Sequence, residues 1–415
     1  MKKRYRVLIL PVMALGFLGG CQKQKLAENA AEAALHVIEE GKQESDISLA
    51  DVVIDDGVIK TESEQAEIVI EPETQTEAQS ETLPEDITIM FAGDVLLSDY
   101  VLNAYENAGG IQGVLDEGYR QAIEEADFFF VNEEFPFSDR GTQAPDKQYT
   151  FRLAPEKVSL LQEMGIDGVS LANNHALDYG VDALLDTCDV LDQAGILRTG
   201  AGRNLEEAKR PVKMEIQGQK IAVIGATRVI PVAEWATHGE QAGMLAAYDP
   251  TILLEEIRRL SGEQDYVIVY VHWGIEREEL PEDYQRAMGR QFIDAGADLV
   301  IGSHPHVLQG IEYYNGKPIV YSLGNYVFGS SIPRTMLLEV KLPGADTDSE
   351  ENPEADSEGS LEEQKLQLRI IPGTSGGGYT QTLQDAGQLQ EFYQYMQKIS
   401  FGVSYGEDGN VIPQP

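Results

Sequence analysis

Five short apolar runs along the chain end at side chains of the kinds that bind metal ions. Runs of this length, bounded by turn residues, are typical of buried strands, and in open α/β sheets ligands bind beyond the carboxyl ends of such strands. The pattern therefore predicts one site at the ends of several neighbouring strands. The runs are ITIMFAGD ending at Asp94, DFFFVNEE at Glu134, GVSLANNH at Asn174 and His175, YVIVYVHWG with His272, and LVIGSHPH with His304 and His306.

Helical patterns alternate with the apolar runs between Asp86 and Pro372. Alternation of this kind predicts an α/β fold with layered strands and helices. The 415 residues, 42% of them hydrophobic, can form a large core, which we interpret as one domain covering 86–400. Its last segment, 381–400, predicts a helix packed on the outside, and 401–415 is a C-terminal tail.

The first 21 residues have the pattern of an export signal. Four basic residues precede an apolar stretch that is short for a membrane span and ends in LGGC at Cys21. This ending resembles the lipobox of bacterial lipoproteins, in which the cysteine receives a lipid after cleavage. We therefore expect Cys21 to be the lipid attachment site and the protein to be anchored in the cell membrane, on its extracytoplasmic face. A plain secretory signal with an incidental cysteine is the alternative.

The other cysteine, Cys188, follows the helical spacing of apolar residues in VDALLDTCDVLDQAG. Free cysteine is among the most buried residue types, so we predict a core thiol here. With Cys21 lipidated, no disulfide framework is possible.

The formal net charge of −39 is unevenly distributed. Residues 22–85 hold 17 acidic residues and 4 lysines, which predicts a solvated, disordered tether. Residues 344–363 hold nine acidic residues and no basic one between two apolar segments, which predicts a disordered loop joining two strands. So acidic a chain is unsuited to nucleic acid, because phosphate recognition needs clustered Lys and Arg.

The side chains at the strand ends form a donor set suited to divalent metals. Imidazole, carboxylate and amide oxygen ligands suit Mn²⁺, Fe or Zn²⁺, and we expect one or two ions. His304 and His306 flank Pro305, which holds the segment open, and in a loop they can serve two ions. The remaining histidines, His36 in the acidic segment and His238 in a loop, lack metal-type neighbours and are interpreted as solvated.

Seven motifs follow one another within 86–372: FAGDVLL, VNEEFP, SLANNHALDYG, VHWGIE, IGSHPHVLQGIE, GKPIVYS and LGNYVF. In this order they resemble the bacterial poly-gamma-glutamate capsule biosynthesis family known as CapA, whose domain is similar to calcineurin-like metallophosphatases. The resemblance implies a four-layer α/β/β/α sandwich with a metal centre at one edge.

The resemblance also implies a role for each strand-end residue. The chain departs from classical metallophosphatases at two positions, because Leu96 stands where they have a histidine and Glu134 where they have a bridging aspartate. One tightly held ion and a weaker second are therefore expected. The implied ligands are Asp94 and His306 for the first metal, Glu134 for the bridge, and Asn174, His272 and His304 for the second.

Three further residues have candidate roles in catalysis. By the resemblance, His175 would protonate the leaving group. Asp178, three residues later, would orient that imidazole if the turn is helical, or would be the N-cap of the next helix. Arg152 in YTFRLAP could hold an anionic substrate group, and a surface salt bridge is the alternative.

Three functions remain open at this level. The first is a lipid-anchored, metal-dependent hydrolase or transferase acting on phosphoester or gamma-glutamyl bonds of the envelope. The second is a non-catalytic partner of a polyglutamate synthase or its export subunits, and the third is a binding lipoprotein that kept the fold without the chemistry. The high negative charge makes tight binding of an anionic polymer difficult without metal bridging. No phosphate-binding loop ending in GK[ST] is present in the sequence, so no motif indicates activation of glutamate by ATP.

Overall fold

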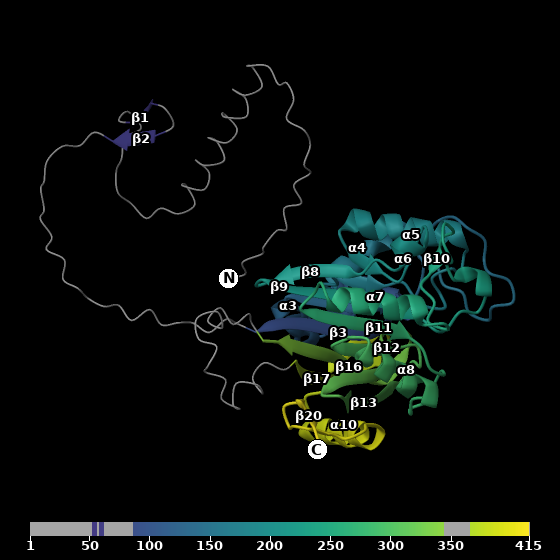
Figure 1. Cartoon of the computed structure of the whole chain (residues 1–415). Coiled ribbons are helices and arrows are strands. Elements are labelled where there is room, and N and C mark those ends of the chain that lie inside the picture. The colour runs from purple at the N-terminus through teal and green to yellow at the C-terminus, as the bar shows by residue number, and fades with distance from the viewer. Residues whose placement is uncertain (1–51, 56–57, 62–85, 344–365, 415) are drawn as a thin grey trace, which may run out of the picture. The chain divides into compact units, whose positions relative to one another are not determined.

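The computed structural model describes residues 52–55, 58–61, 86–343 and 366–414 (Figure 1). They belong to two compact units, Met1–Gln79 and Ser80–Pro415. In the first unit, β1 (Val52–Asp55) pairs antiparallel with β2 (Val58–Thr61). The predicted signal peptide, Cys21, His36, most of the acidic tether and the loop 344–363 lie outside the described residues, so these remain predictions.

The second unit contains an eight-stranded sheet in the order β18-β17-β16-β3-β4-β5-β6, with β15 paired to β3. β3, β4, β5 and β6 run parallel, whereas β16, β17 and β18 add an antiparallel half. The strands are β3 (Ile87–Val95), β4 (Phe128–Glu133), β5 (Gly168–Ser170), β6 (Leu197–Thr199), β15 (Asn325–Val327), β16 (Ser331–Leu342), β17 (Gln367–Gly376) and β18 (Tyr379–Thr382).

A six-stranded sheet faces it, in the order β13-β14-β12-β11-β9-β8. The four central strands are parallel and each edge strand is antiparallel to its neighbour. The strands are β8 (Val212–Ile216), β9 (Gln219–Thr227), β11 (Tyr266–His272), β12 (Leu299–Ser303), β13 (Leu308–Tyr314) and β14 (Lys317–Leu323). All five apolar runs of the sequence thus form strands, as predicted.

Side chains alternate between the two faces of each strand, so a strand contributes to two different hydrophobic cores. In β4, Phe128 and Phe130 join the core between the two sheets, while Phe129 and Val131 join the core beneath the helices on the opposite face. Each such side chain contributes roughly 1.5–3 kcal/mol when fully buried. The eight-stranded sheet is covered by α2 (Asp99–Ala108), α3 (Glu117–Glu125), α4 (Val158–Glu163) and α5 (Val181–Ala194), and the six-stranded sheet by α7 (Thr251–Ser261) and α8 (Asp283–Asp294).

The predicted α/β/β/α sandwich is therefore confirmed (Figure 1). Short elements complete the connections between the layers. These are η2 (Ile111–Gly113), η3 (Pro155–Lys157), β7 (Ala201–Gly202), α6 (Leu205–Ala208), η4 (Ala233–Trp235) and β10 (Gly243–Met244), with β7 and β10 paired.

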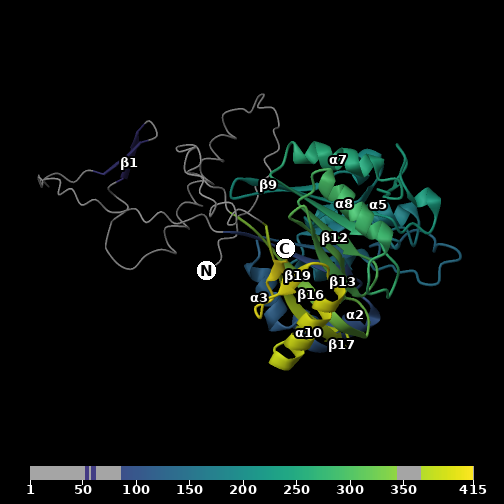
Figure 2. The same ribbon diagram turned by 60° about the horizontal axis from the view of Figure 1, so that its bottom comes forward.

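The predicted C-terminal helix is present at the edge of the sandwich, and it is shorter than the sequence predicts. The segment 381–400 begins with the end of β18, and α10 covers only Ala386–Ile399. Its Phe392 and Met396 are buried in the core between the sheets, so the helix closes one edge of that core next to β13 (Figure 2). The residues that follow form β19 (Val403–Tyr405) and β20 (Val411–Pro413), which pair antiparallel and bury Val403 and Val411 in the same core.

The chain crosses from one sheet to the other between β14 and β15. Gly324, at the crossing, has a φ of 59° and accepts a hydrogen bond from the backbone N of Asp94 at 2.8 Å. A Cβ on Gly93 would lie only 1.8 Å from the Gly324 carbonyl oxygen, so this approach requires glycine at position 93. The crossing brings β15 against the end of β3, beside Asp94.

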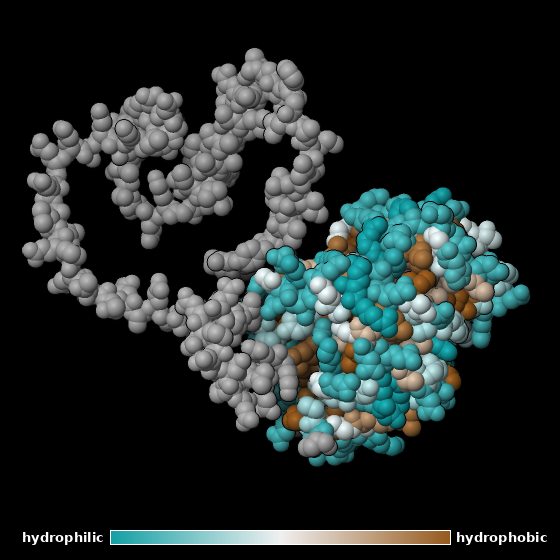
Figure 3. Space-filling view, in the orientation of Figure 1, coloured by the Kyte–Doolittle hydropathy of each residue, from teal (hydrophilic) through white to brown (hydrophobic). Residues whose placement is uncertain are grey.

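The surface of the domain in Figure 3 is mainly hydrophilic, with apolar side chains gathered in small patches. Cys188 is buried in the core under the helices, as predicted, and burial raises the pKa of its thiol to about 12. No helix in the described ranges combines the length and the apolar character needed to cross a membrane.

Candidate metal centre

The predicted ligands converge at the carboxyl ends of parallel strands from both sheets. They follow the strands closely, so the pairing of the strands brings them together. The eight-stranded sheet supplies Asp94 at the end of β3, Glu134 directly after β4 and Asn174 in the turn after β5; the six-stranded sheet supplies His272 at the end of β11 and His304 and His306 after β12.

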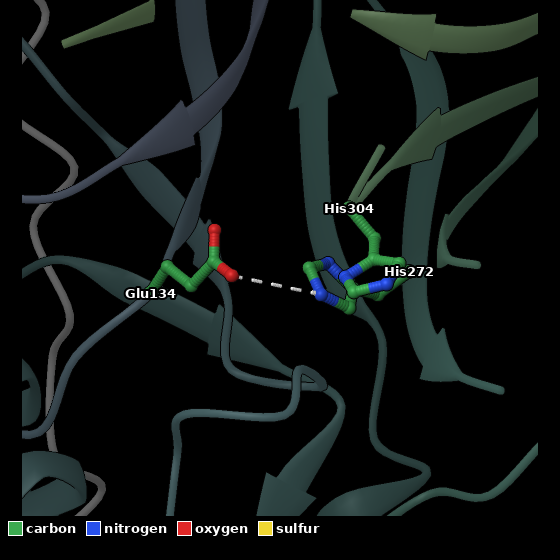
Figure 4. Close-up of side chains that lie close together, drawn as sticks. All are labelled: Glu134, His272 and His304. Carbon is green, nitrogen blue, oxygen red and sulfur yellow. Dashed lines mark ion pairs between the residues drawn. The ribbon is translucent and has the colours of Figure 1, made fainter. Parts of the chain in front are cut away.

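The ligand atoms form two groups that share one carboxylate. Glu134, His272 and His304 make one group, and Asp94, Glu134 and His306 make the other, with the ligand atoms in each lying within 4.8 Å of one another. Figure 4 shows Glu134 pointing toward the two imidazoles of the first group, with Oε1 3.8 Å from Nε2 of His272. Glu134 therefore belongs to both groups, as a bridging ligand would, and its bridging role remains a prediction.

His304 and His306 reach the two groups through an unusual backbone. Their φ values are 98° and 58°, in a region that residues other than glycine rarely adopt. Such a conformation costs on the order of 1–3 kcal/mol and persists only where its surroundings enforce it. The expectation that a loop lets these histidines serve different groups agrees with this geometry.

Hydrogen bonds define which nitrogen of His272 faces the centre. Its Nδ1 lies 2.9 Å from Oγ of Ser303, while its Nε2 lies 2.8 Å from Oδ1 of Asn174. Nε2 and the amide oxygen thus point to the same place, and Asn174 joins the group of Glu134, His272 and His304. An imidazole held in this way through its other nitrogen is a common arrangement around metals.

The two carboxylates concentrate negative charge among the histidines. Burial, followed by the charge of Asp94, raises the pKa of Glu134 well above its ordinary value. Burial alone would lower the pKa of His306, but the carboxylates of Glu134 and Asp94 outweigh it and raise that pKa to about 10. Burial and the charge of His306 lower the pKa of His304 to about 4, and that of His272 falls well below its ordinary value.

This donor set fits a divalent metal. Both carboxylate oxygens of Glu134 and Nδ1 of His304 are buried with no hydrogen-bond partner among the described residues. Burying an unpaired carboxylate is costly, and a cation between the two groups would remove that cost. A bound divalent ion would supply an activated water able to attack a phosphoryl or carbonyl centre. Leu96 is buried in the apolar core under the helices and offers no donor, so the group of Asp94 and His306 has the fewer ligands.

His175 lies beside the two groups and not within either. Its Nε2 is 3.9 Å from Oε1 of Glu134, and its Nδ1 is 2.7 Å from Oδ2 of Asp178. Asp178 therefore orients the imidazole. The alternative N-cap role is wrong, because α5 begins at Val181 with Gly180 as its N-cap.

Lys147, which the sequence does not predict as a site residue, lies against His175. Its Nζ lies 3.0 Å from Nδ1 of His175 and also contacts the carbonyl oxygen of Asn174 and Oδ1 of Asp178. Only 14% of the side chain is exposed. Nothing in the local sequence DKQYTF marks this lysine, because the contacts depend on how the segment 139–151 folds back over the site.

Arg152, the predicted substrate-binding cation, takes a different position. Its side chain is exposed and stacks on Tyr179 with Cζ 4.1 Å from the ring centroid, and Nη1 donates to the carbonyl oxygen of Arg140. No described contact joins it to either donor group, and it forms no ion pair with a described residue. Its substrate role remains a prediction.

An amide network, also missed from sequence, supports the ligands. Asn132 donates from Nδ2 to Oδ1 of Asp94 at 2.8 Å, and Asn173 donates to Oδ1 of Asn132 at 3.0 Å. Oδ1 of Asn173 accepts from the backbone N of His175. The two amides therefore connect a ligand of one donor group to the segment that carries His175.

Two half-buried aromatic rings border the centre. The ring of Phe151 lies 4.4 Å from that of His175, and the ring of Phe328 lies 4.9 Å from that of His306. The two phenylalanine rings are 6.4 Å apart. They form an apolar wall beside two of the histidines.

Comparison with known proteins shows the family to which the chain belongs. The family model described as bacterial capsule synthesis protein PGA_cap matches residues 88–330, and the chain belongs to this family. The chain is 34% identical to the PGA biosynthesis protein CapA of Bacillus subtilis, over 61% of this chain and 67% of that protein. It is 32% identical to the capsule biosynthesis protein CapA of Bacillus anthracis, over 60% of this chain and 62% of that protein.

These matches leave part of each protein uncompared. The chain spans 67% and 62% of the lengths of the two Bacillus relatives.

Among solved structures, a phosphatase of Mycoplasma pneumoniae matches with a TM-score of 0.43 and 13% identity, over 71% of this chain and 95% of that one.

Proposed function

We propose that this protein is a metal-dependent hydrolase or transferase that acts in polyglutamate capsule synthesis, held on the extracytoplasmic face of the membrane by a lipid on Cys21. The observation that carries the catalytic proposal is the sharing of Glu134 by two buried donor groups, with Nε2 of His175 3.9 Å from the same carboxylate. Family membership and the names of the Bacillus relatives support the polymer as the substrate class.

The residues of the site would have different roles in the reaction. The two donor groups would hold one or two ions of Mn, Zn or Fe, since imidazole and carboxylate ligands suit these metals. His175 would donate a proton to the leaving group from Nε2, while Asp178 holds the ring through Nδ1. The wall of Phe151 and Phe328 would limit the access of water to this proton.

The first test is metal content. We expect the mature protein to bind about one to two equivalents of divalent metal, and His272→Ala and His304→Ala to remove most of it. His238→Gln is the matched control, because His238 is exposed and belongs to neither donor group. If the wild-type protein takes up no metal on reconstitution, the proposed metal-dependent activity is contradicted and only the fold is retained.

The second test separates an enzyme from a scaffold. Hydrolysis of γ-linked glutamate oligomers and of a generic phosphodiester is measured with each metal, together with surface polymer in cells. His175→Gln should keep the metal and lower turnover by about 10²- to 10⁴-fold. If no substrate is turned over and His175→Gln supports normal polymer, the protein is a non-catalytic partner of the polyglutamate synthase or its export subunits.

The third test concerns location. One acyl chain binds a membrane only marginally, so the two chains of a diacylglycerol on Cys21 would provide stable anchoring. Cys21→Ser should release the protein or leave it unprocessed, measured by fractionation and by the mass of the N-terminal peptide. Unchanged membrane retention and processing would contradict the lipid anchor.

A further inference from the structure

Arg228 lies at the carboxyl end of β9, next to the candidate metal centre. β9 pairs in parallel with β11, and the backbone N of Arg228 donates to the carbonyl oxygen of His272 at 2.8 Å. A backbone hydrogen bond therefore joins Arg228 directly to His272, a residue of the donor set.

Two tyrosine rings hold the guanidinium group of Arg228. Its Cζ lies 4.0 Å from the ring centroid of Tyr284 and 4.9 Å from that of Tyr248. The hydroxyl of Tyr284 accepts a hydrogen bond from the backbone N of Gly274 at 2.7 Å, which anchors this ring to the segment that carries His272. Tyr248 is 57% exposed, so the stack is open to solvent from its side.

The guanidinium group keeps unused capacity for hydrogen bonds. Nε of Arg228 is buried and has no hydrogen-bond partner among the described residues, and no described acidic side chain forms an ion pair with Arg228. An arginine offers five donors in a planar fork that matches a carboxylate with two parallel hydrogen bonds. Stacking between rings holds that fork in one orientation before a ligand arrives.

Three other cations of this domain are already paired with a carboxylate. Nζ of Lys147 donates to the carbonyl oxygen of Asn174 and to Oδ1 of Asp178, and this carboxylate neutralises its charge. On α8, Arg286 and Arg290 bond to the carboxylate of Glu312. Arg228 is thus a cation beside the donor groups whose charge no described carboxylate neutralises.

We propose that Arg228, Tyr248 and Tyr284 form a carboxylate subsite, which binds a free α-carboxylate of a γ-linked glutamyl chain while a neighbouring unit lies at the metal centre. This inference rests on the proposed function, because it takes the polymer as the substrate. A chain with one carboxylate per unit presents its anionic groups at regular intervals, so one group can reach Arg228 while another part of the chain is at the donor groups. The subsite gives a very acidic protein a local cation with which to hold a polyanion.

The test measures binding, so it does not depend on turnover. The metal-loaded mature protein is titrated calorimetrically with a γ-linked glutamate hexamer. Arg228→Gln should weaken binding about tenfold or more, and Arg228→Lys should weaken it less, because lysine keeps the charge and loses the fork. Tyr248→Ala, which removes an exposed ring, should weaken it a few-fold. Each variant is compared at equal metal content and equal thermal stability.

Arg334→Gln is the matched control. Arg334 is an exposed arginine that also stacks on a tyrosine, with Cζ 4.1 Å from the Tyr395 ring, and its loss changes the net charge by the same amount. It should leave binding unchanged. Equal binding by Arg228→Gln and wild type, or an equal loss in Arg334→Gln, would overturn the subsite.

A second ligand separates failure of the subsite from failure of the proposed function. A glycerol-phosphate oligomer of the same charge is titrated in parallel. If Arg228→Gln weakens the glutamate hexamer and leaves the phosphate oligomer unaffected, the carboxylate assignment is supported. If only the phosphate oligomer binds, and its binding depends on Arg228, the result contradicts both the carboxylate subsite and polyglutamate as the substrate. If the wild-type protein binds the hexamer through Arg228 and hydrolyses no substrate, the subsite is supported and only the proposed catalytic activity is contradicted.

Discussion

Oδ2 of Asp178 lies 2.7 Å from Nδ1 of His175 and accepts a second hydrogen bond, also at 2.7 Å, from the backbone N of Phe151. The other oxygen of the same carboxylate contacts Nζ of Lys147. One fully buried side chain therefore joins the imidazole beside the donor groups to the segment that covers it. The orientation of His175 depends on this carboxylate.

Replacing Asp178 with asparagine should lower turnover and keep the metal. The amide cannot accept from Nδ1 as strongly as a carboxylate, so the ring loses its orientation while the donor groups are untouched. Changes to residues that support a site in this way typically cost 10- to 100-fold, and we expect about that loss. Turnover of a phosphodiester and elemental analysis check this, and wild-type turnover in Asp178→Asn would refute the orienting role.

Replacing Lys147 with methionine should loosen the segment 139–151. The lysine neutralises buried Asp178, and the segment is otherwise held there by backbone bonds such as Ala144 N to the carbonyl oxygen of Asp178. We expect a loss of about 1–3 kcal/mol in the free energy of unfolding, because a buried acceptor loses a partner. Limited proteolysis should also become faster within 139–151. The control is Lys213→Met, whose side chain is 45% exposed; similar losses in both variants would show that the contact with Asp178 is not responsible.

Replacing Glu133 with leucine should stabilise the protein. Its carboxyl group is fully buried on the same face of β4 as Phe129 and Val131, and neither oxygen has a hydrogen-bond partner among the described residues. A buried unsatisfied polar group costs about 1–3 kcal/mol, and the variant should recover much of it.

The pH dependence of the Glu133 effect has a definite sign. Burial raises the pKa of Glu133 well above its ordinary value, so the folded state holds this proton more tightly than the unfolded state. The wild type is therefore penalised at neutral pH, and the penalty shrinks as pH falls toward the ordinary carboxyl pKa. Chemical denaturation of both proteins at neutral and at mildly acidic pH measures this. A gain for Glu133→Leu that grows on acidification would contradict the explanation.

Glu312 should make the protein lose stability in acid. Burial alone would raise its pKa, but hydrogen bonds from Arg290, Tyr321 and Arg286 outweigh this and lower the pKa below its ordinary value. A carboxyl group whose folded pKa is depressed stabilises the fold above its unfolded pKa, and this contribution is lost as pH falls through the folded pKa. Glu312→Gln should therefore be less stable than wild type at neutral pH, with the difference narrowing below the ordinary carboxyl pKa. Denaturation midpoints across that range decide the matter.

The sequence predicts both the strands of the sheets and the convergence of the strand-end side chains, because both follow from the same local signal. An apolar run that stops at Asp94 or His272 identifies a buried strand and a polar side chain at its end together, and parallel pairing does the rest. The family resemblance then assigns Glu134 to the bridge, which the geometry matches.

The parts missed from sequence depend on contacts between distant segments. Asn132 and Lys147 act through partners that lie 38 and 31 residues away, Asp94 and Asp178, and no spacing rule marks such pairs. The sequence predicts a C-terminal helix packed on the outside, and it does not indicate which core covers the buried side of that helix. The core between the sheets covers it, so Phe392 and Val403 belong to the same cluster.

The donor set is divided evenly between the two sheets, three residues from each, and the chain passes from one sheet to the other at Gly324, beside Asp94. An ion held by both donor groups would be a cross-link between the halves of the sandwich. Separation of the sheets and release of the metal would then be one equilibrium, so free metal concentration would set how often the sandwich opens. Chelation should accelerate amide exchange in β3 and β11 together, and excess metal should slow exchange in both to the same degree.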